Sequence, residues 1–243
     1  MSELIKLSER LYYLPFEVET DRPNLFYING DDYSVAVDAG NSKRHVEKFY
    51  KVLIDNNLRL PKYTIISHWH WDHTFGLAFI EGESLSTSLT KEKLKNVCKW
   101  KWTIEDMEER LKTGEDILFC HEFIQKEYPD LSQIEVCLPD ITIDTLTTLN
   151  LGGIRVELIP RPSTHSLDSL FVYLPEEKAL IVEDADNMDF YHGNVYYKDR
   201  LDDMIEFFES LDYDIHLLGH AHPESKKMAL DRLRAISDED LMV

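Results

Sequence analysis

The sequence predicts an α/β fold in which two β-sheets face each other between outer layers of helix, a four-layer αββα sandwich. Three observations support this fold class. Short β-rich runs occur in two blocks, each block ends in helical periodicity, and a charged, glycine-poor stretch separates the blocks. The chain is therefore expected to form a single domain, residues 1–243, with a helical insertion at about residues 81–137.

The first block is expected to open with an antiparallel meander. Runs at Leu25–Ile28 and Tyr33–Val37 flank the turn Gly30-Asp31-Asp32, which is typical of a β-hairpin. Helical spacing of apolar residues behind a polar N-cap predicts a helix at Lys43–Asn56 that packs on the sheet. A further strand is predicted at Tyr63–Ile66. The apolar positions of the helix are Val46, Phe49, Tyr50, Leu53 and Ile54.

The second block repeats this plan with more strands. Runs broken by Gly152-Gly153 and Pro175 predict four strands, and a fifth follows a predicted helix at Asp199–Ser210. A last helix is expected at Pro223–Ile236, with proline in its first turn. The five strands are predicted at Leu146–Leu151, Ile154–Ile159, Ser169–Leu174, Lys178–Val182 and Ile215–Leu218.

The helical insertion carries two blocks of opposite charge. Lysines surround Trp100 and Trp102, and acidic residues dominate from Glu105 to Asp116. One interpretation is a solvated helix whose lysines pair with the acidic stretch. The other is a lid that offers aromatic and cationic contacts to a small anionic substrate. The lysines are Lys91, Lys93, Lys95, Lys99 and Lys101.

Composition disfavours several classes of partner. Lys and Arg number 26 against 46 Asp and Glu, and the net charge of −20 opposes binding to nucleic acid and to anionic membrane surfaces. No apolar run approaches the roughly 18 residues of a membrane span, and residues 1–10 lack the apolar core of a signal peptide. A cytoplasmic location is expected. Cys98, Cys120 and Cys137 form no Cys-x-x-Cys pair and are interpreted as small core residues.

The densest chemical pattern lies just after the strand predicted at Tyr63–Ile66. His68, His70, Asp72 and His73 fall within six positions. Imidazole and carboxylate suit zinc, iron and manganese, and two histidines one residue apart can bind one ion from an extended loop. Asp72 and His73 then point elsewhere, toward a second ion. The pattern predicts a catalytic metal site with an open position for water.

Three further metal-compatible side chains follow apolar strands. His165, Asp184 and His220 each stand just past such a run, where a packed sheet can hold a ligand rigidly. Asp38 also ends a predicted strand, and it has two interpretations. It is either a carboxylate that holds a ligand imidazole by its second nitrogen or a turn residue ahead of Gly40.

Five other histidines lie outside this set. His45 and His121 fall in predicted helices and are interpreted as surface or packing residues, and His216 stands at the start of the last predicted strand. His192 is expected to form a hydrogen bond within a loop, and the alternative is that it enters the pocket. His222 is a candidate for contact with substrate or with a carboxylate beside the metals.

Over about residues 10–225 the sequence resembles the metallo-β-lactamase superfamily of binuclear metallohydrolases. The resemblance rests on His68-x-His70-x-Asp72-His73, then His165, Asp184 and Gly219-His220, in the order of the family. It implies the metallo-β-lactamase fold and two divalent ions, with zinc expected and manganese or iron as alternatives. One ion would be held by His68, His70 and His165, the other by Asp72, His73 and His220, with Asp184 bridging.

The sequence departs from the family pattern in two places. Glu183 stands where members usually have glycine before the bridging aspartate. The loop around His165 reads Thr164-His165-Ser166-Leu167-Asp168, where Gly-His-Thr-Pro-Gly is common. Neither change removes a ligand.

The resemblance implies hydrolysis by a hydroxide that bridges the two ions, with Asp72 binding one metal and orienting that hydroxide. The expected substrate is a small ester, thioester or lactone, and the alternative is a small-molecule phosphodiester. Two further interpretations are a di-iron redox protein and a non-catalytic binding protein. The predicted partner is thus a small molecule, neither nucleic acid nor membrane, and the oligomeric state is left open.

Known branches of the family narrow the substrate. The β-lactamases most studied use cysteine where Asp184 stands, and lactonases often place a tyrosine where Asn187 stands. The candidate substrate contacts are Trp69, Trp71, Asn187, Tyr191 and His222, with Trp100 and Trp102 as further positions.

Overall fold

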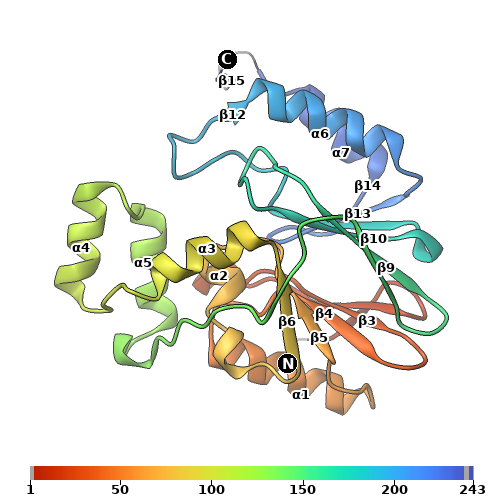
Figure 1. The fold of residues 1–243 in the computed structure, drawn as a ribbon, viewed down its shortest axis with the longest axis horizontal. Helices are drawn as coiled ribbons and strands as arrows, with labels where there is room; N and C mark the ends of the chain where they lie inside the picture. The colour runs from red at the N-terminus through yellow and green to blue at the C-terminus, as the bar shows by residue number, and fades with distance from the viewer. Residues whose placement is uncertain (1–2, 238–240, 243) are drawn as a thin grey trace.

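The computed structural model describes residues 3–237 and 241–242 and contains two facing sheets with helices on both outer faces (Figure 1). In the first sheet the strands lie side by side in chain order. Strands β1 to β4 are antiparallel, which confirms the predicted meander, and β4 to β7 are parallel. The strands are β1 (Ile5–Lys6), β2 (Leu11–Leu14), β3 (Leu25–Asn29), β4 (Ser34–Val37), β5 (Tyr63–Ile65), β6 (Glu83–Ser86) and β7 (Ile141–Thr142).

The second sheet has the order β14-β13-β11-β10-β9-β8. Its neighbouring strands β11 and β13 are parallel, so their carboxyl ends lie at the same edge of the sheet. A separate parallel pair joins β12 (Tyr196–Tyr197) to β15 (Leu241–Met242). The strands of the second sheet are β8 (Thr147–Asn150), β9 (Arg155–Pro160), β10 (Leu170–Leu174), β11 (Ala179–Glu183), β13 (Ile215–Leu218) and β14 (Glu224–Ser225).

Three apolar layers hold the fold together. Between the sheets, Ile28 and Val35 from the first sheet pack in one cluster with Leu158 and Val172 from the second. Helix α1 covers the outer face of the first sheet, and helices α6 and α7 cover the outer face of the second. This arrangement confirms the predicted αββα sandwich. The helices are α1 (Lys43–Asp55), α2 (Trp71–Thr74), α3 (Ser88–Val97), α4 (Ile104–Thr113), α5 (Leu118–Glu127), α6 (Lys198–Ser210) and α7 (Lys226–Arg234).

The buried face of α1 is narrower than the sequence suggests. The hydroxyl of Ser42 caps the helix by accepting a hydrogen bond from the backbone N–H of His45. Val46, Phe49 and Leu53 are buried, but Ile54 is 59% exposed. Each residue turns the helix by about 100°, so the position after Leu53 points away from the buried apolar face of the helix.

The helical insertion begins later than predicted. Residues 83–86 form strand β6, which pairs in parallel with β5 and so belongs to the first sheet. The sequence of this strand is Glu-Ser-Leu-Ser, which lacks the β-branched and aromatic residues that mark strands. Helices α3, α4 and α5 therefore follow the sheet strand and project from one side of the sandwich (Figure 1).

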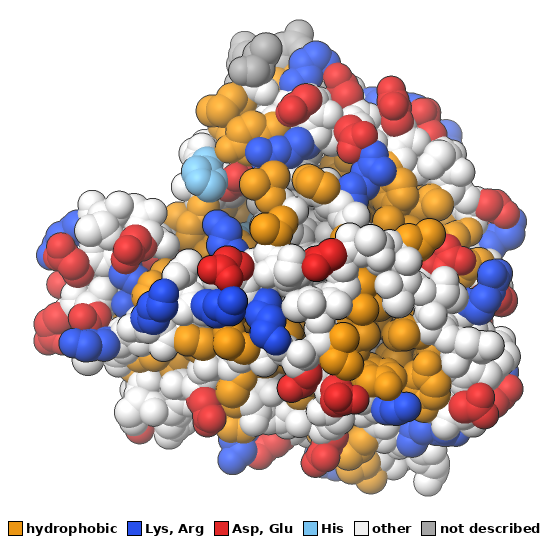
Figure 2. All heavy atoms as spheres, viewed as in Figure 1, with side chains coloured by type: hydrophobic (Ala, Val, Ile, Leu, Met, Phe, Trp, Pro, Cys, Tyr) orange, Lys and Arg blue, Asp and Glu red, His pale blue; other side chains and the backbone are white. Residues whose placement is uncertain are grey.

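Among the described residues, the five lysines around Trp100 and Trp102 form no ion pair with the acidic stretch from Glu105 to Asp116. Lys95 pairs with Glu92 within α3, and Lys99 donates to the side chain of Asn96. Basic side chains gather on the exposed surface over α3 (Figure 2). The link between the two blocks is aromatic instead, because the Arg110 guanidinium lies 4.5 Å from the ring centre of Trp100.

The last helix also differs from its prediction. It begins at Lys226, where the hydroxyl of Ser225 accepts a hydrogen bond from the backbone N–H of Met228. Pro223 precedes the helix, because Glu224–Ser225 forms strand β14 against β13. Serine at the N-cap therefore sets the helix start, not proline at the first turn.

The three cysteines differ in burial. Cys120 is buried as predicted, but Cys98 is exposed and Cys137 is half-buried, so the core interpretation is wrong for Cys98. Cys98 ends α3 on its solvent side, and its thiol donates to the carbonyl of Val136.

Among the helices of the described residues, none has the length and apolar character that a membrane crossing requires.

Candidate metal centre

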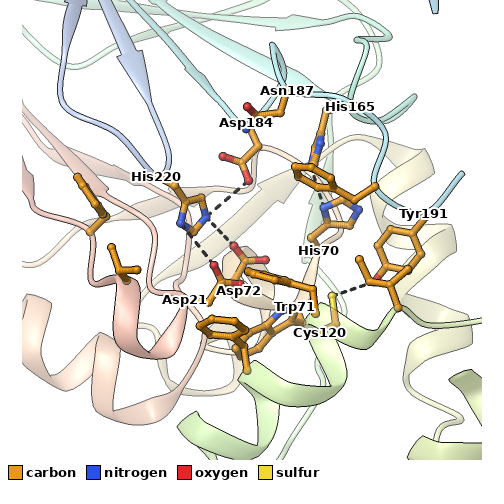
Figure 3. Close-up of a pocket in the computed structure, with 16 residues that line it drawn as sticks. Asp21, His70, Trp71, Asp72, Cys120, His165, Asp184, Asn187, Tyr191 and His220 are labelled. Atoms are coloured by element: carbon orange, nitrogen blue, oxygen red, sulfur yellow. Dashed lines mark hydrogen bonds and ion pairs between the residues drawn. The ribbon is translucent and has the colours of Figure 1, made fainter. Parts of the chain in front are cut away.

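The predicted ligands come from four separate segments that meet at one edge of the sandwich. His68, His70, Asp72 and His73 follow strand β5 and continue into helix α2. Two more ligands follow the neighbouring parallel strands, since Asp184 comes directly after β11 and His220 after β13. His165 lies in the loop between β9 and β10. The close-up shows His70, Asp72, His165, Asp184 and His220 turned toward one another (Figure 3).

One group of predicted ligands is made of three imidazoles. The nitrogen atom Nδ1 of His70 lies 2.9 Å from Nε2 of His68 and 2.9 Å from Nε2 of His165. All three rings are buried. The three histidines thus present one nitrogen each to a common point.

The second group combines two carboxylates with two imidazoles. The Oδ2 atom of Asp72 lies 2.9 Å from Nε2 of His73 and 3.0 Å from Nε2 of His220. The Oδ2 atom of Asp184 lies 3.2 Å from Nε2 of His73 and 3.6 Å from Nε2 of His220. The other oxygen of Asp184 is buried and has no hydrogen-bond partner among the described residues.

These separations fit a pair of divalent ions. Around a tetrahedral zinc ion with bonds of about 2.0–2.1 Å, neighbouring ligand atoms lie about 3.3 Å apart. The donor atoms of the two groups lie 2.9–3.6 Å apart. Imidazole nitrogen and carboxylate oxygen are also the donors that zinc, manganese and iron accept. The unpartnered buried oxygen of Asp184 is a further donor atom that a bound cation could use.

Most of these imidazoles are fixed by their second nitrogen. The Nδ1 atom of His165 contacts the backbone carbonyl of Met188 at 2.8 Å, and Nδ1 of His68 contacts the Ser67 hydroxyl at 3.0 Å. Nδ1 of His73 lies 2.6 Å from Oδ2 of Asp38. Such contacts set the tautomer and direct the other nitrogen into the centre. Of the two interpretations of Asp38, the structure therefore favours the one that holds a ligand imidazole.

The electrostatics of the two groups differ. Burial and the neighbouring histidines lower the pKa of His68 and His70 well below the usual value, so both rings are neutral. Burial alone would raise the pKa of Asp72 and Asp184, but His73 and His220 hold it well below the usual range.

The two imidazoles of the second group, which we call the acidic group, are favoured in their protonated form by the same carboxylates. Burial alone would lower the pKa of His220, but Asp184 and Asp72 raise it to about 9. Asp72 and Asp38 likewise raise the pKa of His73 well above the usual value, against the effect of burial. A bound divalent ion would replace these protons as the positive charge beside the carboxylates.

Two acidic residues near the centre were not predicted as functional. Asp21 lies in the loop after β2, and its Oδ1 atom is 3.6 Å from Nδ1 of His220. Burial and the charge of Asp72 raise the pKa of Asp21 to about 7. No motif marks Asp21, because the contact joins residues from opposite ends of the chain.

Glu183 is the second unpredicted residue, at the position where family members usually carry glycine. Its backbone adopts φ of 52°, the left-handed region that favours glycine. Its carboxylate is buried and has no hydrogen-bond partner among the described residues. Across from it, a Cβ atom on Gly219 would lie 2.5 Å from Oδ1 of Asp184, so glycine is required there.

A pocket of about 380 Å³ opens onto the centre. Three of the candidate substrate contacts line it, namely Trp71, Asn187 and Tyr191. The ring of Tyr191 lies over His70 with 5.1 Å between ring centres, but its hydroxyl contacts Asp116 at 3.3 Å. Tyr191 therefore forms a wall of the pocket and directs its hydroxyl toward the helical insertion (Figure 3).

The remaining candidate contacts do not line this pocket. Trp69 and Trp100 face a small neighbouring cavity instead, together with Trp102. His222 is exposed, and its ring packs on Phe16 with 5.4 Å between ring centres.

Two of the other histidines, His45 and His192, have packing and loop roles. His45 is buried against Gly40, which has φ of 71°. His192 forms the expected loop contact, with 2.7 Å between its Nδ1 and Oδ2 of Asp189.

Residues 19–220 match the family model described as the metallo-beta-lactamase superfamily. The chain belongs to the metallo-beta-lactamase superfamily. Members of this superfamily are generally metal-dependent hydrolases and typically bind divalent metals. A comparison with curated proteins finds no match by sequence.

Solved structures of other superfamily proteins share the fold. A metallo-beta-lactamase from Pontibacter korlensis is 16% identical, with a TM-score of 0.66 over 96% of this chain and 99% of that one. A metallo-beta-lactamase family protein from Thermus thermophilus is 15% identical, with a TM-score of 0.66 over 95% of this chain and 80% of that one. At these identities the likeness shows the fold alone.

A larger protein contains the same fold. The stereoselective inverting sec-alkylsulfatase Pisa1 from Pseudomonas sp. is 15% identical, with a TM-score of 0.67 over 96% of this chain. This chain covers 41% of the sulfatase. The fold therefore occurs both as most of a chain and as part of a longer one.

Proposed function

We propose that this protein is a metal-dependent hydrolase of small esters, thioesters or lactones that holds two divalent ions, with zinc expected. The proposed ligands of one ion are His68, His70 and His165. Those of the other are Asp72, His73 and His220, with Asp184 between the two ions. The observation that carries the proposal is the pair of adjoining donor groups with ligand-like separations at the floor of a pocket.

The residues around the centre have definable tasks in such a reaction. Divalent ions bound there would lower the pKa of water toward neutrality and polarise the oxygen of a substrate carbonyl. Asp72 lines the pocket, so its carboxylate is placed to accept a hydrogen bond from the attacking water. Asp38 and the Met188 carbonyl keep His73 and His165 in the tautomers that ligation needs.

The pocket supports a small molecule as the partner. Its volume of about 380 Å³ falls within the range of roughly 300–1,000 Å³ that is usual for small-molecule sites. The net charge of −20 opposes a polyphosphate partner. We therefore extend the proposal to a low-molecular-weight substrate rather than nucleic acid or membrane.

Elemental analysis and turnover, measured on the same preparations, test the proposal. The protein as purified is expected to contain about two divalent ions per chain and to hydrolyse at least one member of an ester, thioester and lactone panel. Asp184→Ala should lose metal and activity together. Asp202→Ala, which alters an exposed carboxylate on α6, is the matched control and should lose neither. Full turnover by metal-free protein would overturn the proposal.

A further inference from the structure

The walls of the pocket are apolar and come from three distant segments. Phe16 and Val18 lie in the loop after β2, Phe119 and Phe123 come from α5, and Phe190 follows β11. The rings of Phe119 and Phe123 stack with 4.3 Å between their centres. Val18 is 69% exposed and Phe119 is 49% exposed, although both are large apolar side chains. Apolar side chains gathered around a cavity while open to solvent mark a surface that binds an apolar group.

The charged side chains that line the same pocket, three carboxylates and His220, all lie at the candidate metal centre. The pocket lining includes the carboxylates of Asp21, Asp72 and Asp184, and none of its lining residues in the described chain is lysine or arginine. The cation on α5, Lys126, is exposed and packs on the Phe123 ring with 3.6 Å between Nζ and the ring centre, but it does not line the pocket. A second anionic group on a substrate, placed away from the metal ligands, would therefore lose its water among these aromatic rings without a lysine or arginine in the lining to pair with. Burial of an unpaired charge is strongly unfavourable.

Two cationic side chains near the centre face a different cavity. Lys93 and Arg200 line a cavity of about 500 Å³ that also touches His70, His165 and Tyr191. His70, His165 and Tyr191 line both cavities, whereas Lys93 and Arg200 line only the second. The cavity with lining cations is therefore a different one, and the apolar pocket beside α5 is suited to an uncharged group.

We propose that the pocket between α5 and the loop after β2 selects substrates with a neutral, apolar substituent next to the scissile bond, such as an alkyl or aryl group, and rejects anionic ones. This inference rests on the proposed hydrolase function and names its substrate class. Phe119 and Phe123 are the residues that determine the preference, and they do so by contact with the substituent.

Hydrolysis of a matched ester series tests the inference. The series consists of 4-nitrophenyl acetate, hexanoate and monosuccinate, with a second series of alkyl acetates to vary the alcohol side. Each buried methylene is worth about 0.8 kcal/mol, or roughly a fourfold change in kcat/KM. Hexanoate should exceed acetate by at least about tenfold and exceed monosuccinate by more, or hexyl acetate should exceed ethyl acetate by the same factor.

Variants of α5 make the test specific to this pocket. Phe119→Ala should reduce the preference for the longer alkyl ester by about tenfold. Leu118→Ala, at a neighbouring residue that is 62% exposed and does not line the pocket, should leave the preference unchanged. Phe119→Lys should raise kcat/KM for the monosuccinate relative to the hexanoate, since it places a cation in the pocket.

The outcomes separate the two proposals. Absence of hydrolysis across both series, with metal bound, would count against the hydrolase function itself. Equal rates for acetate, hexanoate and monosuccinate, and for the alkyl acetates, would overturn the substrate class and leave the hydrolase function standing. An unchanged preference in Phe119→Ala would show that the selectivity arises elsewhere and would also overturn the inference.

Discussion

Two clusters of histidine and carboxylate among the described residues differ in whether an arginine side chain joins them. In one, the acidic group of the candidate metal centre, two carboxylates face His73 and His220. The other brings together Asp186, His216 and Glu224. There the Arg232 guanidinium lies 2.6 Å from Asp186 and 2.6 Å from Glu224. Among the described residues, the carboxylates of the first cluster pair with imidazoles and with no lysine or arginine.

This difference separates a structural cluster from a binding site. Arg232 already supplies positive charge to Asp186 and Glu224, so that cluster links α7 to β14 and to the loop after β11. Asp72 and Asp184 have imidazoles as their partners, and imidazoles can release protons and become ligands. Residue types alone would make both clusters metal candidates, whereas the resident guanidinium disqualifies one.

Of the changes that test this difference between the clusters, removal of metal should have the largest effect. Treatment with a chelator is expected to lower kcat/KM by at least about a thousandfold, because metal-bound water and the polarised carbonyl together supply several kcal/mol of transition-state stabilisation. Added zinc should restore the rate. Arg232→Met protein should respond to chelator in the same way as the parent. A rate that survives chelation would remove the functional distinction between the clusters.

Substitution of Asp38 should weaken metal binding without abolishing it. Asp38→Asn loses the charge that orients His73, and changes of this kind cost about 10–100-fold in metal affinity. Competition with a chromophoric chelator measures the affinity. Asp55→Asn, at the exposed end of α1, is the matched control and should bind as the parent does. An unchanged affinity in Asp38→Asn would mean that Asp38 is only a turn residue.

Removal of the guanidinium should destabilise the fold and spare the metals. Arg232→Met leaves buried Asp186 without its cation, and the free energy of unfolding is expected to fall by about 2 kcal/mol. This is less than for a fully buried pair, because the Arg232 side chain is 39% exposed. Urea denaturation measures the change, and Lys227→Met, which breaks an exposed pair on the same helix, should cost well under about 1 kcal/mol. Loss of metal from Arg232→Met would contradict the assignment of the Arg232 cluster to a purely structural role.

The smallest expected effect concerns Glu183, which directly precedes Asp184 in the chain. Glu183→Gly removes a buried unpartnered carboxylate and relieves a left-handed backbone, and should raise the free energy of unfolding by about 1 kcal/mol. Glu183→Ala removes the carboxylate but keeps the Cβ atom, so it should gain less. Thermal denaturation of the two metal-loaded variants compares them. Greater stability in the alanine variant would indicate that the backbone is not strained there.

The candidate ligands could be proposed from the sequence because their placement is local. His68, His70, Asp72 and His73 share one loop, and Asp184 and His220 stand at the ends of apolar strands that are recognisable by composition. Parallel pairing of β11 and β13 then brings those two ends together.

The features that sequence reasoning missed depend on contacts over long distances in the chain. Asp21 contacts His220, and Arg232 contacts Asp186, although the two residues of each pair lie far apart in the sequence. Phe119 has no periodic pattern that assigns it to a pocket, because it is a half-exposed side chain on a helix whose Cys120 and Ile124 pack in the core. Strand β6 was not predicted, because a short strand with mostly polar residues has little apolar pattern.

Anomalous diffraction from crystals of zinc-loaded protein, collected at the zinc absorption edge, tests the central claim most directly. The account predicts two adjacent peaks, one among His68, His70 and His165 and one among Asp72, His73 and His220, with Asp184 between them. A peak among Asp186, His216 and Glu224, or no peak at the edge of the sandwich, would contradict it.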